Sequence, residues 1–202
     1  TYNLPNVHLM DCLTDPIVEI TETGIRTEAG ETELDMLILA TGYDALTGAL
    51  LAIDLRGRDG RQLRDKWASG PRSFLGMMVE GFPNLFATSG PNGPAALANL
   101  ITIAENDVDW VANLIEHMKA EGLASTEVTK AAEDRWMNLV LALAERSLVR
   151  KAKTWWVGSN VKGKPEGLTM FVGGFNKYRE HCEAAAASGY ADLSFEKTLE
   201  KV

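Results

Sequence analysis

A glycine- and proline-rich stretch, GPNGP at 90–94, leads directly into the apolar stretch AALANL at 95–100. Two Gly and two Pro in five residues exclude regular structure, so the pattern predicts a turn followed by the start of a helix. The first turn of a helix has unpaired N–H groups and the positive end of the helix dipole, and both favour an anion. Small side chains also let a flat ring approach the backbone. The stretch therefore predicts either a ligand site of this kind or an ordinary entry into a helix.

Two adjacent tryptophans, Trp155 and Trp156, form a second candidate site. They lie in the segment 151–175, which contains five Gly and four Lys and has little periodicity. An irregular segment of this length is usually functional or mobile. An indole N–H can donate a hydrogen bond to a ligand while neighbouring lysines attract its phosphates. Anchoring of the tail to the core is an equally weighted alternative.

Other chemistries find little support in the sequence. The three histidines are scattered and have no metal-ligand spacing, so we expect no metal site, and we expect His117 to face solvent on a helix. The sequence contains no GxSxG elbow, so we predict no nucleophilic serine. Neither GxGxxG nor GxxxxGK[ST] is present, so these 202 residues alone cannot build a dinucleotide pyrophosphate site.

The composition is that of an ordinary globular protein, with 46% hydrophobic and 24% charged residues. A net charge of -8 argues against nucleic-acid binding, and no apolar run reaches the about 18 residues of a membrane span. Cys12 and Cys182 are far apart, which favours a reduced, cytoplasmic setting and leaves one long-range disulfide open. Because the chain begins TYNLPNVHLMD without Met, we interpret it as a fragment.

Strands are predicted in the first forty residues and again before the GPNGP stretch. A short run at 7–10 precedes an alternating pattern at 17–21, and a turn then leads to 25–27, which is typical of a hairpin. The run MLILA at 36–40 is apolar throughout, as in strands buried on both faces of a parallel sheet. A second buried strand is predicted at 85–88.

Helices are predicted at 98–121, from about 125 to 143, and from 176 to the stop at Gly189, with a polar loop and short helix near 54–67. Three carboxylates of the first helix are expected to face solvent: Glu105, Asp107 and Asp109. Strands mixed with helices, and strands that end in Gly-rich turns, indicate an α/β architecture.

Taken together, the segments resemble the C-terminal part of type I Baeyer–Villiger monooxygenases, in the family's order and spacing over nearly the whole chain. The resemblance is carried by TYNLPNVHLMD, ELDMLILATGYDALTGAL, DLRGRDG, GFPNLF, GPNGPAALANL, TWWVGSNVKGKP, FVGGFNKYR and SGYADLSF. It implies part of a flavoprotein with two Rossmann-like dinucleotide-binding domains, C-terminal helices and a long irregular loop. Residues 1–39 would end the NADP-binding domain. Residues 40–202 would form the C-terminal half of the FAD-binding domain, with a substrate loop at 90–100 and a mobile loop at 151–175.

The resemblance also implies an activity. Family members use FAD and NADPH to insert one oxygen atom from O₂ beside a ketone carbonyl, through a C4a-peroxyflavin, to give an ester or lactone. The partners would be a small ketone, O₂ and the missing N-terminal portion of the enzyme, without nucleic acid or membrane. The family's Gly-rich motifs and catalytic arginine lie upstream of Thr1, so we assign no catalytic residue and expect this chain to be inactive alone. A related flavin monooxygenase that oxidises nitrogen or sulfur, and a free-standing non-catalytic domain, remain as alternatives.

Matching positions imply the site residues. Leu100, and with it Asn99, would contact the flavin at the helix start, while Trp155 and Asn160 would belong to the loop that reaches NADP. The ketone pocket would be lined by three small or apolar residues: Ala95, Ala96 and Leu97.

Overall fold

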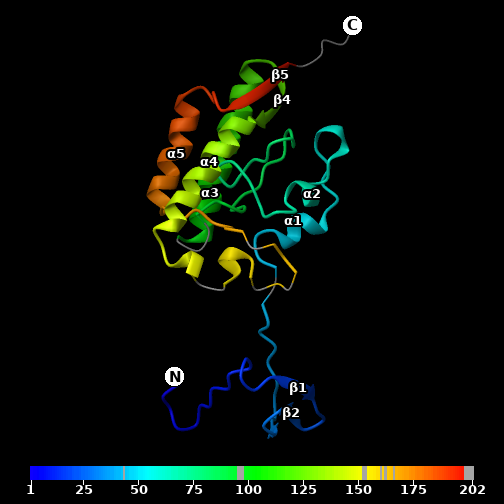
Figure 1. The fold of residues 1–202 in the computed structure, drawn as a ribbon. Coiled ribbons are helices and arrows are strands. Elements are labelled where there is room, and N and C mark those ends of the chain that lie inside the picture. Colours follow the sequence, from blue (N-terminus) through cyan, green and yellow to red (C-terminus); the bar gives the residue numbers. More distant parts are fainter. Residues whose placement is uncertain are drawn as a thin grey trace. The chain divides into compact units, whose positions relative to one another are not determined.

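The computed structural model describes residues 1–42, 44–94, 98–151, 154–159, 161, 163–165 and 167–197. The chain divides into two compact units, Thr1–Gly42 and Tyr43–Val202 (Figure 1). Helices and small sheets alternate along it, which confirms the predicted mixed α/β class. Each unit is described by itself.

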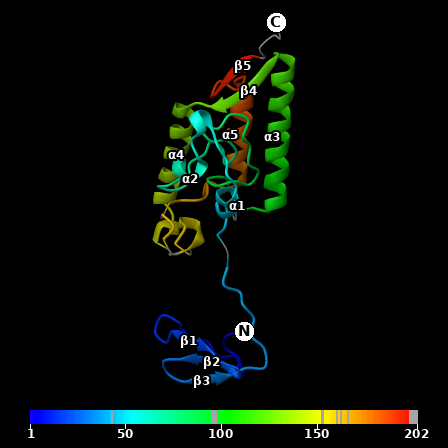
Figure 2. The ribbon, with the colours of Figure 1, turned by 90° about the vertical axis from the view of Figure 1, so that its right-hand side faces the viewer.

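The first unit is a three-stranded antiparallel sheet in the order β1-β2-β3 (Figure 2). Its strands are β1 (Ile17–Ile20), β2 (Gly24–Thr27) and β3 (Glu31–Glu33). The predicted hairpin at 17–27 is therefore confirmed, and β3 extends it. The hydroxyls of Thr21 and Thr23 donate to the Glu31 carboxylate at 2.7 and 2.9 Å, and these hydrogen bonds lower the pKa of Glu31.

Two of the strands predicted in this unit are not formed. Residues 7–10 and 36–40 are irregular, and the apolar run is open to solvent, with Met36 74% and Ile38 78% exposed. Both described sheets are antiparallel, and neither includes the run at 36–40. A continuous apolar run becomes a buried strand only where neighbouring strands and covering elements exist, and the described residues supply neither.

The second unit contains three long helices and a two-stranded antiparallel sheet (Figure 1). The long helices are α3 (Leu100–Ala120), α4 (Lys130–Glu145) and α5 (Phe175–Ala187), and the strands are β4 (Leu123–Val128) and β5 (Leu193–Lys197). The short elements are α1 (Gly48–Ala52), α2 (Leu63–Lys66) and 3-10 turns at Arg58–Gly60, Val149–Lys151 and Trp155–Val157.

The helix predictions are confirmed except at one start. Residues 123–128 pair with β5, so α4 begins after Thr129, whose hydroxyl accepts the N–H of Ala132, and not near Ser125. The predicted strand at 85–88 is irregular. The N–H of Ala87 donates a hydrogen bond to the carbonyl of Met77, but this bond is not part of a ladder between strands.

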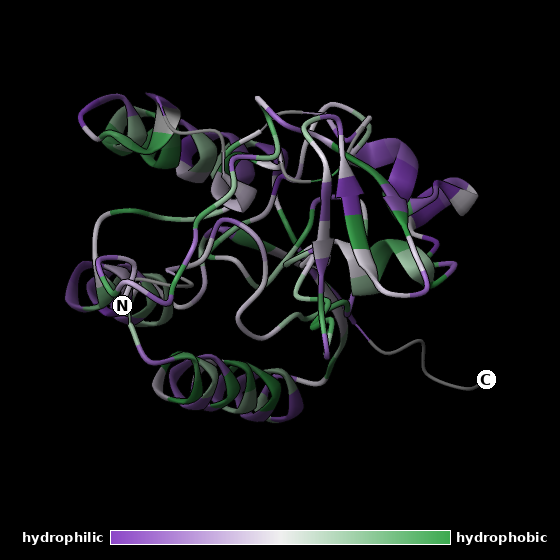
Figure 3. Cartoon of the chain, turned by 90° about the horizontal axis from the view of Figure 1, so that it is seen from below, coloured by the Kyte–Doolittle hydropathy of each residue, from purple (hydrophilic) through white to green (hydrophobic). Residues whose placement is uncertain are grey.

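An aromatic cluster forms the centre of the second unit. Trp136 of α4 stacks on Phe171 at 5.0 Å between ring centroids and meets Phe74 and Tyr178 edge-on. The helices are hydrophobic on one side and hydrophilic on the other (Figure 3). A smaller cluster joins Leu63 of α2 to three residues of the segment that follows it: Trp67, Val79 and Phe82.

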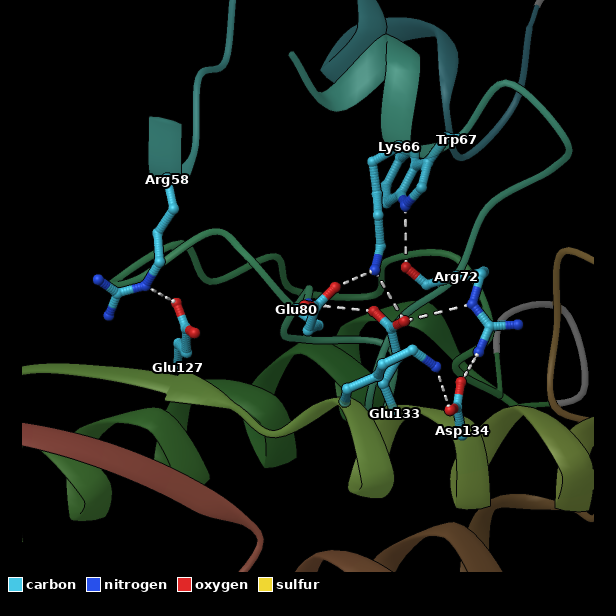
Figure 4. A network of polar contacts seen from close by, with 9 residues as sticks. Arg58, Lys66, Trp67, Arg72, Glu80, Glu127, Glu133 and Asp134 are labelled. Atoms are coloured by element: carbon cyan, nitrogen blue, oxygen red, sulfur yellow. Dashed lines mark hydrogen bonds and ion pairs between the residues drawn. The ribbon is translucent and has the colours of Figure 1, made fainter. Parts of the chain in front are cut away.

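A buried carboxylate fastens that segment to α4. Glu133 is 1% exposed and accepts from Lys66 Nζ at 3.0 Å, Arg72 Nε at 3.2 Å and the N–H of Glu80 at 3.0 Å (Figure 4). Arg72 also pairs with the half-exposed Asp134 at 2.5 Å. Two cations and one amide thus surround a carboxylate that would otherwise be costly to bury.

We expect Glu133→Gln to lower the free energy of unfolding by about 3 kcal/mol, because it leaves Lys66 and Arg72 facing a neutral amide. Asp134→Asn, in the same network but half-exposed, should cost less than about 1 kcal/mol. Urea unfolding of both variants measures the difference, and equal losses would contradict the role given to Glu133.

Candidate functional site

The loop at 90–94 is buried, and hydrogen bonds of its backbone and of the Asn92 side chain hold it to other segments of the protein. Asn92 is fully buried with φ +67°, and its N–H and Nδ2 donate to the carbonyls of Thr169 and Leu168, each at 2.8 Å. Its carbonyl accepts the indole N–H of Trp136 at 3.2 Å. The hydroxyl of Ser73 donates to the neighbouring Pro91 carbonyl at 2.7 Å. The buried polar groups of this loop are therefore paired within the protein.

The glycines of this loop lie against another backbone. A Cβ on Gly90 would lie 2.3 Å from the carbonyl oxygen of Gly76, and a Cβ on Gly76 would lie 2.7 Å from the Cα of Gly93. Gly76 also has φ +71°, which favours glycine. The absence of a side chain at 90 is thus explained by packing within the protein, while a Cβ on Gly93 would lie 3.2 Å from the carbonyl oxygen of Gly90. A ligand ring that came close to the backbone of this stretch would therefore have to do so after Pro94.

The two tryptophans lie in the 3-10 turn Trp155–Val157, and both are half-buried. Their rings meet edge-on, with centroids 5.9 Å apart. The hydroxyl of Thr154 accepts the N–H of Trp156, and Gly158, with φ +76°, ends the turn. The turn is therefore a formed element and not an unstructured tail.

Thr169 connects the tryptophan turn to the loop at 90–94. Its N–H and hydroxyl donate to the carbonyl of Trp156 at 2.9 and 2.8 Å, and its own carbonyl accepts from the N–H of Asn92. The structure thus brings together two stretches that the sequence singled out separately. Sequence reasoning missed Thr169, although the apolar run LTMF at 168–171 inside an irregular segment was a signal of burial.

The predicted flavin-contacting residues lie at the start of α3. Asn99 caps this helix, because its Oδ1 accepts the N–H of Ile101 at 2.9 Å. Leu100 and Ile101 are 54% and 72% exposed, so an apolar surface surrounds the helix N-terminus. Four other predicted site residues lie outside the residues that the structure describes: Ala95, Ala96, Leu97 and Asn160.

One carboxylate of α3 is not solvated as predicted. Asp107 is 1% exposed, accepts the N–H of Ser89 at 2.8 Å and lies 2.6 Å from the hydroxyl of Tyr178. Burial raises its pKa. Its spacing of three and seven residues to Trp110 and Leu114 was the available signal, since those residues define the buried face of α3.

Two other polar side chains lie against partners within the protein. Lys164, near the tryptophan turn, is nearly buried and forms an ion pair with Asp44, so its charge is already partly neutralised by the protein. His117 is half-buried against Tyr190 and Phe195, and not solvent-facing as predicted. Among the described residues, no cluster of His, Cys, Asp or Glu has the geometry of a metal site, and no helix is long and apolar enough to cross a membrane.

Comparison with known proteins gives consistent matches, although no family model matches the chain. A Baeyer–Villiger monooxygenase of Pseudooceanicola batsensis is 43% identical over 202 residues, which cover 100% of this chain and 37% of that relative. The closed crystal structure of a cyclohexanone monooxygenase superposes with a TM-score of 0.89 at 35% identity, covering 98% of this chain and 37% of that one. The structure of OTEMO in complex with FAD and NADP gives 0.86 at 38% identity, covering 96% and 36%.

The chain spans just over a third of the length of these relatives, while nearly all of it is matched. Identity of this level over the whole chain, together with a closely similar fold, shows common descent. The chain belongs to the Baeyer–Villiger monooxygenase family and corresponds to the C-terminal part of such an enzyme.

Proposed function

We propose that this chain acts within a full-length FAD- and NADPH-dependent Baeyer–Villiger monooxygenase, which inserts one oxygen atom from O₂ beside a ketone carbonyl to give an ester or lactone. The observation that carries the proposal is the joining of the tryptophan turn to the loop before α3 through Thr169 and Asn92. A ketone, a flavin and a nicotinamide must meet in one place, and the two stretches predicted to contact them are coupled here.

We assign residues 1–39 to the end of the NADP-binding domain and 40–202 to the C-terminal half of the FAD-binding domain. Exposed apolar residues support a larger assembly. Besides the run at 36–40, α3 exposes Ile101, Val108 and Ile115 at intervals of seven residues, which forms one stripe along the helix. The remaining two-thirds of a full-length relative would supply the surface that covers this stripe.

The start of α3 fits the edge of a flavin. It joins the positive end of a 21-residue helix to the exposed side chains of Leu100 and Ile101, so a flat ring with an anionic edge would find both charge and apolar contact. When bound, FAD would activate oxygen and NADPH would supply the hydride. The backbone at Leu100, positioned by the Asn99 cap, would stabilise negative charge on the ring.

The other roles are those that the family resemblance implies. Ala95, Ala96 and Leu97 would line the ketone pocket. Trp155 would donate its indole N–H to NADP, with Asn160 in the same loop. Both cysteines are free, which supports a reducing, cytoplasmic location.

The direct test gives the full-length protein FAD, NADPH, O₂ and either cyclohexanone or a tertiary amine. The proposal expects a lactone from the ketone with one NADPH consumed per product. Oxidation of the amine with no lactone would instead favour the nitrogen-oxidising alternative. Absence of flavin binding would favour a non-catalytic protein.

Trp155→Phe in the full-length enzyme should raise KM for NADPH about tenfold, because the phenyl ring fills the turn but lacks the N–H, and one hydrogen bond is worth about 1.4 kcal/mol. Trp156→Phe is the matched control and should leave KM unchanged. Bound flavin, measured by absorbance, should stay at the wild-type level in both. Unchanged NADPH kinetics in Trp155→Phe would remove this residue from the cofactor site.

Asn92→Ala should raise KM for NADPH and for the ketone together. The substitution removes the donor to the Leu168 carbonyl and places alanine at φ +67°, at a combined cost of about 2–4 kcal/mol. Amide hydrogen exchange at Thr169 and Phe171 should become faster. An effect on only one of the two KM values would contradict the coupling of the loops.

A further inference from the structure

A buried hydrogen-bond chain links α3, α5 and the turn at 75–76. The hydroxyl of Tyr178, on α5, lies 2.6 Å from Asp107 Oδ1 on α3 and 2.8 Å from the carbonyl oxygen of Leu75. Tyr178 and Asp107 are 0% and 1% exposed, so bulk water does not supply further partners.

The chemistry of these three groups determines how many hydrogens the hydrogen-bond chain must contain. A phenol has one hydrogen to donate, a carbonyl oxygen only accepts, and an ionised carboxylate only accepts. Both contacts of the Tyr178 oxygen have full hydrogen-bond length, and a single hydrogen shared between two acceptors would make longer contacts. A second hydrogen is therefore required in one of these two contacts. The hydrogen of the neighbouring Cys182 thiol lies in neither of them and the Leu75 carbonyl has none, so Asp107 is the group that carries it.

The surroundings of Asp107 favour its neutral form. Its other oxygen accepts the N–H of Ser89 at 2.8 Å, and Asn106 Nδ2 is a distant 3.5 Å away. The titratable groups that face it are Tyr178 and Cys182 of α5, and no ion pair joins it to a Lys, Arg or His within the described part of the chain. Burial raises its pKa, and burial also raises the pKa of Cys182 to about 12, which keeps that thiol neutral.

We propose that Asp107 is a neutral carboxylic acid in the folded protein and donates its proton to Tyr178, whose single hydrogen is thereby committed to the Leu75 carbonyl. This inference does not depend on the proposed function. Leu75 has φ +55° and precedes Gly76 with φ +71°, so the clamped carbonyl belongs to a left-handed turn that touches Gly93 of the loop at 90–94. The proton on Asp107 thus holds the turn that supports this loop.

The clamp has a pH dependence whose sign is fixed. The ordinary pKa of an Asp carboxyl, 3.8, is exceeded in the folded state, so the folded protein binds the proton more tightly than the unfolded chain does. Its stabilising contribution is fully present below that ordinary value and is lost as the pH rises through the raised pKa. On ionisation, the Tyr178 hydrogen turns to Asp107 and the Leu75 carbonyl loses its donor.

Infrared difference spectroscopy of the full-length protein, at a pH where the exposed Asp carboxyls are ionised, tests the proposal. The spectrum of wild type minus Asp107→Asn should contain a carboxylic acid C=O band. The spectrum of wild type minus the matched control Asp109→Asn, a residue exposed on the same helix, should instead contain a carboxylate band. A carboxylate band in the Asp107→Asn difference would overturn the proposal.

Carbon-13 NMR of wild-type protein labelled at the Asp carboxyl carbons keeps the test independent of variant folding. One Asp carboxyl should keep the chemical shift of a protonated acid well above the pH at which the exposed Asp residues ionise. Titration of every Asp carboxyl together near its ordinary pKa would refute the neutral acid.

Discussion

The structure of the second unit depends on the burial of one irregular backbone segment. A loop taken out of water must pair its N–H and carbonyl groups within the protein. Asn92 meets this requirement by joining two carbonyls, of Thr169 and Leu168, to an indole N–H from α4. A side chain on Gly90 would collide with the carbonyl oxygen of Gly76, and a Cβ on Gly93 would lie close against the carbonyl oxygen of Gly90. The loop at 90–94 and the tryptophan turn are thereby placed with respect to one another.

Two further devices hold the segment at 66–80, against which this loop packs. The carboxylate of Glu133 accepts hydrogen bonds from Lys66, Arg72 and the N–H of Glu80, and Tyr178 contacts the carbonyl of Leu75. Buried polar groups of this kind contribute little net stability compared with apolar packing, but they select one arrangement of the chain. A unit with few strands thus obtains a defined loop structure.

Elements with strong periodicity were predictable from the sequence. α3 and α5 followed from apolar spacing and glycine stops, and the hairpin at 17–27 from alternation. The start of α4 was wrong because the pairing of β4 with β5 overrides the helical pattern at 125–128, and local sequence does not encode a partner some seventy residues away. The run at 36–40 indicated burial that the described residues do not provide. At the site, the irregular turn at 90–94 was predictable from its glycines and prolines. The linking role of Thr169 and the burial of Asp107 were not, because both depend on tertiary contacts.

The central claim is that the start of α3 and the tryptophan turn serve one cofactor site. A crystal structure of the full-length protein with FAD and NADP bound tests it most directly. The account predicts the flavin ring against the first turn of α3 at Leu100, and the indole N–H of Trp155 within hydrogen-bond distance of NADP. A flavin that contacts neither the helix start nor the loop preceding it, or an NADP remote from Trp155, would contradict the account.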